Sequence, residues 1–204
     1  MIATPPHADV PQGRFVLGLA GSPRRHGNSE RLLDVCLEGA SAAGAEVFKL
    51  RVADYGIAPC KGCNSCSRTG DCAIKDRMAE VYELLDAASA VVVATPVFFA
   101  TVPAVLKALY DRCQRYWARR FVLSHPAPET RPGGLLVCGG GGDPYGPGCA
   151  VTTSRSVFGV LRIAMEEPIV VEGADKSGEI AGFPEAIASA RALGELLGRQ
   201  AATP

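Results

Sequence analysis

The sequence predicts an α/β fold in which a five-stranded parallel sheet carries helices on both faces. Short apolar runs alternate with segments of helical spacing five times along the chain, and no internal repeat interrupts that order. The run AVVVAT at residues 90–95 is unbroken, apolar and rich in β-branched side chains, as a strand covered on both faces requires. A length of 204 residues suits one domain. The prediction is therefore a single doubly wound α/β domain.

Each expected strand is a short apolar run bounded by glycine, proline or polar residues, and five such runs occur in order: 14–20, 45–50, 90–95, 134–138 and 168–172. Each expected helix has apolar residues at a spacing near 3.6, with polar residues opposite: 28–43, 76–87, 102–118, 152–165 and 183–199. Asn28 or Ser29 is expected to cap the first helix and Asp76 the second. Gly44 is expected to end the first helix.

Composition excludes several classes of function. The chain is 48% hydrophobic and 21% charged, and its 21 basic and 21 acidic residues give a formal net charge of zero. Neither a nucleic-acid footprint nor an acidic-membrane footprint is expected from that balance. No apolar run reaches the ~18 residues that a membrane span needs.

Residues 1–13 are polar and rich in proline, and we expect them to form a disordered tail before a domain covering 14–204. This segment lacks the basic and apolar regions of a signal peptide, so the expected compartment is the cytoplasm. Thiols stay reduced there. The eight cysteines of the chain therefore favour metal or cluster chemistry over disulfides.

Four cysteines lie within thirteen residues of a loop expected at 59–75: Cys60, Cys63, Cys66 and Cys72. Their spacing, C-x2-C-x2-C-x5-C, brings the first three thiolates around one point and supplies the four ligands of a [4Fe–4S] cluster. Two alternatives stay open. Zinc sites usually pair two knuckles across a longer gap, and bare thiols would form a thiol–disulfide switch. The other cysteines are expected in the core or in an ordinary loop: Cys36, Cys113, Cys138 and Cys149.

Three loops follow the carboxyl ends of expected strands, where ligands bind in folds of this class. The loop after the first strand runs into a helix and offers hydroxyl, amide and guanidinium donors to a phosphate. Those donors are Ser22, Arg24, Asn28 and Ser29. The loop is neither a Walker A motif nor G-x-G-x-x-G. Alternatively, this loop is only a turn whose polar side chain caps the following helix.

The other two loops offer an apolar face and a close backbone approach. Pro96, Val97, Phe98 and Phe99 follow the third strand, where a flat apolar ring fits; the alternative is that both phenylalanines are core residues. Gly139, Gly140, Gly141 and Gly142 follow the fourth strand, and glycines let backbone adopt positive φ beside a ring. Together the three loops predict a site for a mononucleotide with one terminal phosphate.

Three motifs in this order resemble the iron–sulfur flavoproteins of the NADPH-dependent FMN reductase family: GSPRRHGNS, PCKGCNSCSRTGDCAIKDRM and TPVFFATVPAVLKALYDR. The resemblance covers residues ~14–172 and implies a flavodoxin-like sheet in the order 2-1-3-4-5 with noncovalently bound FMN. It also implies a [4Fe–4S] cluster on the four clustered cysteines, and association as a homodimer or homotetramer.

The resemblance implies a role for each loop. Ser22, Arg24, Asn28 and Ser29 would hold the FMN phosphate, Pro96 to Phe99 would meet the ring, and Gly139 to Gly142 would flank it. The chain departs from the family pattern in three places. Arg77 stands where relatives often have Asp, Phe98 where they often have Tyr, and Asp143-Pro144-Tyr145 replaces a Gly-Gln-Glu ending.

The function expected from these features is an FMN- and [4Fe–4S]-containing oxidoreductase that couples a two-electron partner to one-electron transfer. Its electron donor and acceptor would be small molecules or proteins, with NAD(P)H as a possible co-substrate or ferredoxin as a possible partner. The alternatives are a cluster-free NAD(P)H-dependent FMN or quinone reductase, a non-enzymatic flavodoxin-type electron carrier, and a zinc-stabilised binding module.

Overall fold

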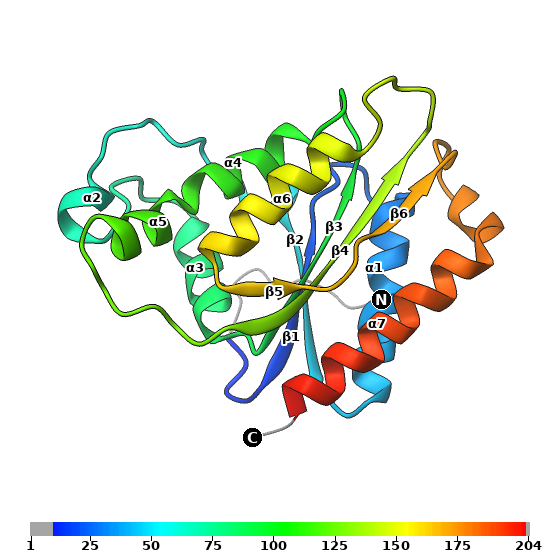
Figure 1. Ribbon diagram of the computed structural model, residues 1–204, viewed down its shortest axis with the longest axis horizontal. Coiled ribbons are helices and arrows are strands. Elements are labelled where there is room, and N and C mark those ends of the chain that lie inside the picture. The colour runs from blue at the N-terminus through cyan, green and yellow to red at the C-terminus, as the bar shows by residue number, and fades with distance from the viewer. Residues whose placement is uncertain (1–9, 203–204) are drawn as a thin grey trace.

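The computed structural model describes residues 10–202 and shows a parallel sheet between two layers of helices (Figure 1). The strands are β1 (Phe15–Ala20), β2 (Glu46–Arg51), β3 (Ala90–Pro96), β4 (Arg131–Gly139), β5 (Ile163–Met165) and β6 (Ile169–Glu172). The strand order β2-β1-β3-β4-β5, with β6 also paired to β4, confirms the predicted flavodoxin-like fold class.

The helices on the two faces alternate with the strands along the chain. They are α1 (Asn28–Ala42), α2 (Cys66–Thr69), α3 (Met78–Ala87), α4 (Ala104–Arg112), α5 (Gln114–Phe121), α6 (Gly148–Val160) and α7 (Pro184–Ala202). Two short 3-10 turns are η1 (Val52–Tyr55) and η2 (Glu179–Gly182). Within the described residues no helix is both long and apolar enough to cross a membrane.

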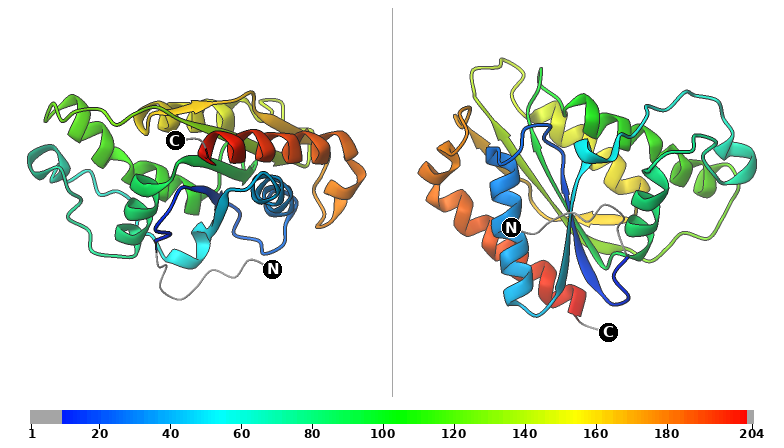
Figure 2. Two further views of the ribbon diagram at one scale, coloured as in Figure 1. Left: turned by 90° about the horizontal axis from the view of Figure 1, so that it is seen from below. Right: turned by 180° about the vertical axis from the view of Figure 1, so that it is seen from behind.

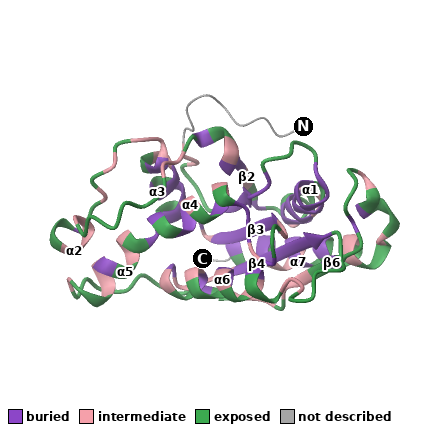
Figure 3. Cartoon of the chain, turned by 90° about the horizontal axis from the view of Figure 1, so that it is seen from above, coloured by how far each residue is buried: buried purple, intermediate pink, exposed green. Residues whose placement is uncertain are grey.

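Two hydrophobic cores lie on opposite faces of the sheet. One packs α1 and α7 against it, and the other packs α3, α4 and α6 (Figure 2). Every residue of β1 is buried, because its side chains alternate between these two cores. Its neighbour β3 is buried over most of its length (Figure 3). The helices α1 and α7 approach so closely that a Cβ on Gly194 would collide with the carbonyl of Cys36. A glycine is therefore required at this crossing.

Two short strands, β5 and β6, pair with β4 where the sequence predicted a single strand at 168–172, and that prediction corresponds to β6 alone. The short strand β5 pairs with the start of β4, at Arg131↔Ile163, and β6 pairs with its end, at Leu136↔Ile169. The predicted helix at 152–165 was wrong at its C-terminal end. That helix stops at Val160, because Arg162 adopts a left-handed φ of 57° before β5 begins.

The long helix predicted at 102–118 is also corrected. Helix α4 ends at Arg112 and α5 begins at Gln114, so Cys113 separates two helices. Gly44 follows α1 with φ 93°, as its predicted role as the terminating residue requires. The predicted tail at 1–13 falls mostly on residues 1–9, outside the described residues, and Val10 packs against the core.

Candidate functional site

The three predicted ligand loops lie together at one edge of the sheet. Strands β1, β3 and β4 are neighbours, so the loops after them emerge side by side, at the upper edge in Figure 1. Backbone hydrogen bonds connect their starting points: Gly21 N donates to Ala94 O at 2.8 Å, and Val97 N donates to Cys138 O at 2.9 Å. The structure thus brings the predicted mononucleotide residues to a single edge, which we call the mononucleotide edge.

The loop after β1 presents buried hydroxyls at the start of α1. Ser22 is buried, and its Oγ accepts a hydrogen bond from Arg24 N at 3.1 Å. Ser29 is buried in the first turn of α1, a helix of 15 residues whose first N–H groups lack partners within the helix. The Arg24 guanidinium donates to Asp175 O at 3.1 Å and stays exposed. These groups suit an anion at the helix N-terminus.

Asn28 has a different local role from the predicted helix cap. Gly27 occupies the N-cap position, and no side chain caps α1. Both polar atoms of the Asn28 amide instead bind the segment after β6. Its Nδ2 donates to Ala174 O and Lys176 O at 3.0 Å each, and its Oδ1 accepts from Gly178 N at 3.0 Å and Ile180 N at 3.3 Å. Asn28 therefore positions a neighbouring loop.

That neighbouring loop, residues 173–180, is a fourth wall that the sequence analysis missed. Gly173 N and Ala174 N both donate to Gly139 O, and Ser177 Oγ donates to His26 O at 3.1 Å. The segment connects the loop after β1 to the glycine loop after β4. The signal was present, because the segment follows the strand predicted at 168–172, and the rule used for the other three strands applies to it equally.

A group of buried ion pairs lies at the first turn of α1, beside the mononucleotide edge. Glu30 is 1% exposed, and its carboxylate lies 2.8 Å from Lys49 Nζ and 3.1 Å from Arg51 Nε. Burial raises the pKa of Glu30, but hydrogen bonds from Lys49 and the His26 N–H, with the charges of Lys49 and Arg51, outweigh it. The pKa therefore lies below its ordinary value. The negative charge in the first turn of α1 is thus paired with two cations.

The aromatic pair after β3 is exposed, so the alternative that both are core residues is wrong. Phe98 is 44% exposed and Phe99 is 99% exposed. A tight turn presents them: Phe98 N donates to Thr101 O at 2.8 Å and Thr101 N donates to Phe98 O at 3.1 Å. Phe99 and Ala100 adopt left-handed φ values of 49° and 63°. Such a turn places an apolar face in reach of a ligand at this edge.

In the glycine loop after β4, the backbone angles and the close neighbours disfavour residues with a side chain. Gly141 and Gly142 both have φ 79°, which L side chains rarely adopt. A Cβ on Gly140 would lie 3.2 Å from the Asp175 side chain, and a Cβ on Gly139 would lie 3.3 Å from Val97. The glycines therefore let this loop pass closely between its two neighbours at the edge.

The four clustered cysteines line one small cavity in the loop between β2 and α3, which we call the cysteine cavity. All four are free thiols; Cys60 and Cys63 are exposed, and Cys66 and Cys72 are partly buried. The loop curls because Gly62 and Asn64 adopt positive φ. Among residues 10–202, no three His, Cys, Asp or Glu side chains are arranged around one metal-ion position.

The thiols are close enough to affect one another electrostatically. Burial raises the pKa of the Cys66 thiol, and the charges of Cys72, Cys60 and Cys63 raise it further. Three cationic residues line the same cavity: Lys61, Arg112 and Arg115. A four-thiolate site suits a cationic metal centre, and the neighbouring cations offset the negative charge that the thiolates leave in excess.

Arg112 fixes the base of the cysteine loop, and sequence reasoning assigned it no role. Its side chain is 1% exposed, and Nη1 and Nη2 lie 2.9 and 3.0 Å from the two carboxylate oxygens of Asp76. The same guanidinium donates to Ala58 O at 2.9 Å and to Ile74 O at 3.3 Å. Asp76 also accepts from Ala58 N at 2.9 Å. Both ends of the loop therefore meet on one buried ion pair.

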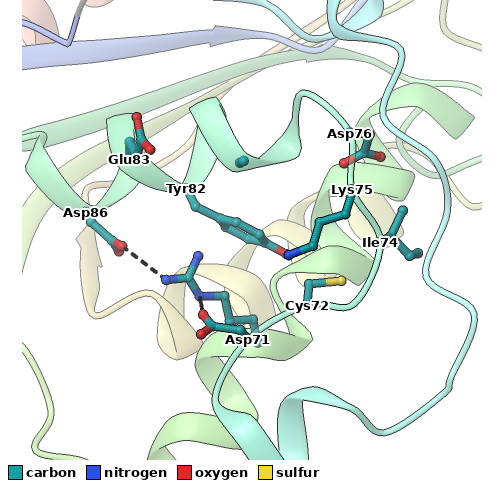
Figure 4. Close-up of a pocket in the computed structure, with 10 residues that line it drawn as sticks. Asp71, Cys72, Ile74, Lys75, Asp76, Tyr82, Glu83 and Asp86 are labelled. Atoms are coloured by element: carbon teal, nitrogen blue, oxygen red, sulfur yellow. Dashed lines mark ion pairs between the residues drawn. The ribbon is translucent and has the colours of Figure 1, made fainter.

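Helix α5 holds the outer part of the same loop. Arg119 donates to Gly70 O at 2.7 Å and to Asp71 Oδ1 at 2.9 Å. Arg115 lies between Asp71 and Asp86 and packs over the Tyr82 ring at 4.4 Å (Figure 4). A second cavity of about 600 Å³ lies between the loop and α3, and Cys72 and Arg115 border both cavities.

Comparison with known proteins places the chain in a family. Residues 15–171 match the sequence profile of the NADPH-dependent FMN reductase family. An iron–sulfur flavoprotein of Methanosarcina thermophila is 36% identical over 125 residues, which cover 61% of this chain and 63% of that protein. One from Archaeoglobus fulgidus is 34% identical over 121 residues, covering 59% and 52%. One from Methanocaldococcus jannaschii is 33% identical over 146 residues, covering 70% of each chain.

The matches to the first two of these relatives span less than two thirds of their length. Solved structures agree on the fold. An NAD(P)H:quinone oxidoreductase from Methanothermobacter marburgensis has a TM-score of 0.64 at 18% identity, over 91% of this chain and 97% of that chain. An FMN-dependent NADH-azoreductase from Bacillus anthracis has a TM-score of 0.65 at 12% identity, over 91% and 99%. The chain therefore belongs to the NADPH-dependent FMN reductase family, a family of flavin-dependent oxidoreductases.

Proposed function

We propose that the protein is an FMN-dependent oxidoreductase that also carries a [4Fe–4S] cluster. The observation that carries this proposal is the meeting of Cys60, Cys63, Cys66 and Cys72 on one cavity, in a chain whose relatives are named iron–sulfur flavoproteins. The C-x2-C-x2-C start of the motif is typical of cluster-binding cysteines, whereas structural zinc sites usually pair two such knuckles across a longer gap. The spacing therefore favours the cluster over zinc.

The residues of the mononucleotide edge fit a phosphate and a flat ring. Ser22 and Ser29 would offer hydroxyl donors to the FMN phosphate at the α1 N-terminus, and Arg24 would pair with its charge. Asn28 would support that site by holding the 173–180 loop in place. The Glu30 carboxylate would repel a bound phosphate only weakly, because Lys49 and Arg51 neutralise its negative charge.

The ring would lie between the turn after β3 and the glycine loop after β4. Phe98 and Phe99 would supply apolar contact, with Pro96 and Val97 fixing the start of that turn. Gly139, Gly140, Gly141 and Gly142 would bring backbone close to the ring. When bound, FMN exchanges one or two electrons and the cluster one at a time, so together they would couple NAD(P)H or another two-electron donor to a one-electron acceptor.

Around the thiolates, this chain would supply positive charge and hydrogen-bond donors. Lys61, Arg112 and Arg115 line the cysteine cavity and offset the negative charge of four thiolates. We expect the protein to assemble as a homodimer or homotetramer. The expected compartment is the cytoplasm, because the four thiols must stay reduced to hold iron.

The test is the visible spectrum of the full chain purified without oxygen, with assays for iron, sulfide and FMN. We expect FMN bands with a broad brown absorbance that bleaches on reduction, and four iron atoms per chain, as a cubane requires. Turnover with NADPH or NADH then separates a reductase from an electron carrier. Iron-free protein that still turns over contradicts the proposal and leaves the cluster-free FMN or quinone reductase.

A further inference from the structure

We infer that Arg112 is a positioning residue that closes the cysteine loop and reserves its Nε–H for a sulfur atom of the bound cluster. The inference rests on the proposed function, because it assumes a cluster on Cys60, Cys63, Cys66 and Cys72. It goes further by assigning one side chain two separable effects. The first is mechanical retention of the loop, and the second is tuning of the cluster by charge and hydrogen bonding.

The mechanical effect follows from the contacts of the guanidinium. Its two terminal nitrogens make four hydrogen bonds, which reach Ala58 before the first cysteine and Ile74 and Asp76 after the last. Between these points the loop has only the four-residue helix α2 as regular structure. The planar fork of arginine spans the carboxylate and both carbonyls at once, a geometry that a lysine ammonium does not reproduce.

The tuning effect follows from the one nitrogen that those contacts leave over. Arg112 Nε is buried and has no hydrogen-bond partner among the described residues. An N–H buried without an acceptor is costly, and more so when the group is charged. Arg112 also lines the cysteine cavity, where thiolates and inorganic sulfides are the natural acceptors. A bound cluster would therefore give the Arg112 Nε–H the acceptor that the described residues do not supply.

Arg112 also differs from Arg119, which holds the outer part of the loop. Arg119 bonds to Gly70 and Asp71 at the outer part of the loop but does not border the cysteine cavity. It supplies retention without a donor or a charge at the sulfurs. This difference gives a matched control for the experiment.

The experiment measures iron content, the rate of iron loss to a chelator and the cluster reduction potential by EPR-monitored titration, in FMN-loaded protein purified without oxygen. Arg112→Met is expected to lose iron roughly tenfold faster, at the low end of the ~10–100-fold effects of outer-shell partners on metal sites. Its potential is expected to shift downward, because a cation and an N–H no longer stabilise the extra electron.

Two further variants separate retention from tuning. Arg112→Lys keeps the cation and loses the fork, so iron loss speeds up while the potential shifts less than in Arg112→Met. Asp76→Asn removes a negative charge beside the same guanidinium, so the potential shifts upward although the loop is also loosened. If Arg112 served only to hold the loop, Arg112→Lys and Asp76→Asn would both lose iron faster, but their reduction potentials would not shift in opposite directions. Arg119→Met is expected to leave the potential unchanged.

The inference is overturned if wild-type protein holds a cluster and Arg112→Met or Arg112→Lys retains both its iron-loss rate and its potential. It is also overturned if Asp76→Asn and the Arg112 variants shift the potential in the same direction. If Arg112→Met fails to fold, as judged by circular dichroism and FMN content, Arg112→Lys and Asp76→Asn decide the matter. Wild-type protein without iron overturns the proposed function itself, which is a distinguishable result.

Discussion

The mononucleotide edge and the cysteine loop are built by different means. The edge is formed by backbone, because the carboxyl ends of β1, β3, β4 and β6 meet there and their loops bond to one another. The cysteine loop has little regular structure, and long side chains from α4 and α5 hold it instead. This difference teaches that two sites in one domain can depend on separate sets of interactions. It also predicts that each can be damaged without the other.

The largest expected effect is the loss of one site alone. Cys66→Ala removes a thiolate from the cysteine cavity, so we expect iron to be lost and the brown absorbance with it, while FMN stays bound. Iron, sulfide and flavin assays on the same sample check this. Cys149→Ala, an exposed cysteine elsewhere, is the control and should keep its iron. Loss of flavin together with iron would show that the two sites are not independent.

The second-largest effect is expected from a substitution at Glu30, in the first turn of α1 beside the mononucleotide edge. Glu30→Gln removes the buried carboxylate that Lys49 and Arg51 share and leaves them only their part-exposed partners Asp34 and Asp54, and we expect a loss of about 3 kcal/mol in unfolding free energy near neutral pH. The wild-type pKa of Glu30 lies below its ordinary value of 4.5, so the stabilisation is present above that value and is lost as pH falls through the folded-state pKa.

Urea unfolding from about pH 7 to about pH 3 measures this dependence. The Gln variant should show a flatter loss of stability toward acid than wild type. Glu38→Gln, on the exposed face of the same helix and paired with Arg191, should change stability by less than about 1 kcal/mol. An unchanged pH profile in the Glu30 variant would contradict the prediction.

A smaller effect is expected from the link between α1 and the 173–180 loop. Asn28→Ala removes four hydrogen bonds, and we expect about 2–3 kcal/mol of lost stability together with weaker FMN binding. Denaturant unfolding and a flavin titration measure the two effects, and the iron content should not change. Ser177→Ala removes a single exposed hydrogen bond from the same loop and should be nearly silent. Equal effects of the two variants would argue against a special role for Asn28.

The smallest effect on stability is expected at the most exposed aromatic. Phe99→Ser should change the unfolding free energy by no more than about 0.5 kcal/mol, because the ring is 99% exposed. FMN affinity should still fall by roughly fivefold, which corresponds to about 1 kcal/mol of lost aromatic contact. Phe121→Ser, which is also exposed but lies on α5, is the control for affinity. Unaltered FMN binding in Phe99→Ser would place the ring elsewhere.

The same contrast explains how much the sequence predicts. Alternating apolar runs predict the sheet, its buried strands and the edge where Ser22, Phe98 and Gly140 meet, because periodicity and chain order determine those positions. The break at Cys113 and the split between β5 and β6 leave no periodic signal, since each depends on one or two local backbone angles. The Arg112–Asp76 pair is also invisible in the spacing, because its partners are brought together only by packing.

The Asn28 link has a consequence for the order in which the chain is assembled. It joins α1 to carbonyl and amide groups 146 to 152 positions later in the chain. The arginines that hold the cysteine loop, by contrast, all lie before residue 120. During synthesis from the N-terminus, the cysteine loop therefore has its partners available some sixty residues before the mononucleotide edge is complete. We expect ribosome-bound chains ending near residue 160 to be able to close the first site but not the second.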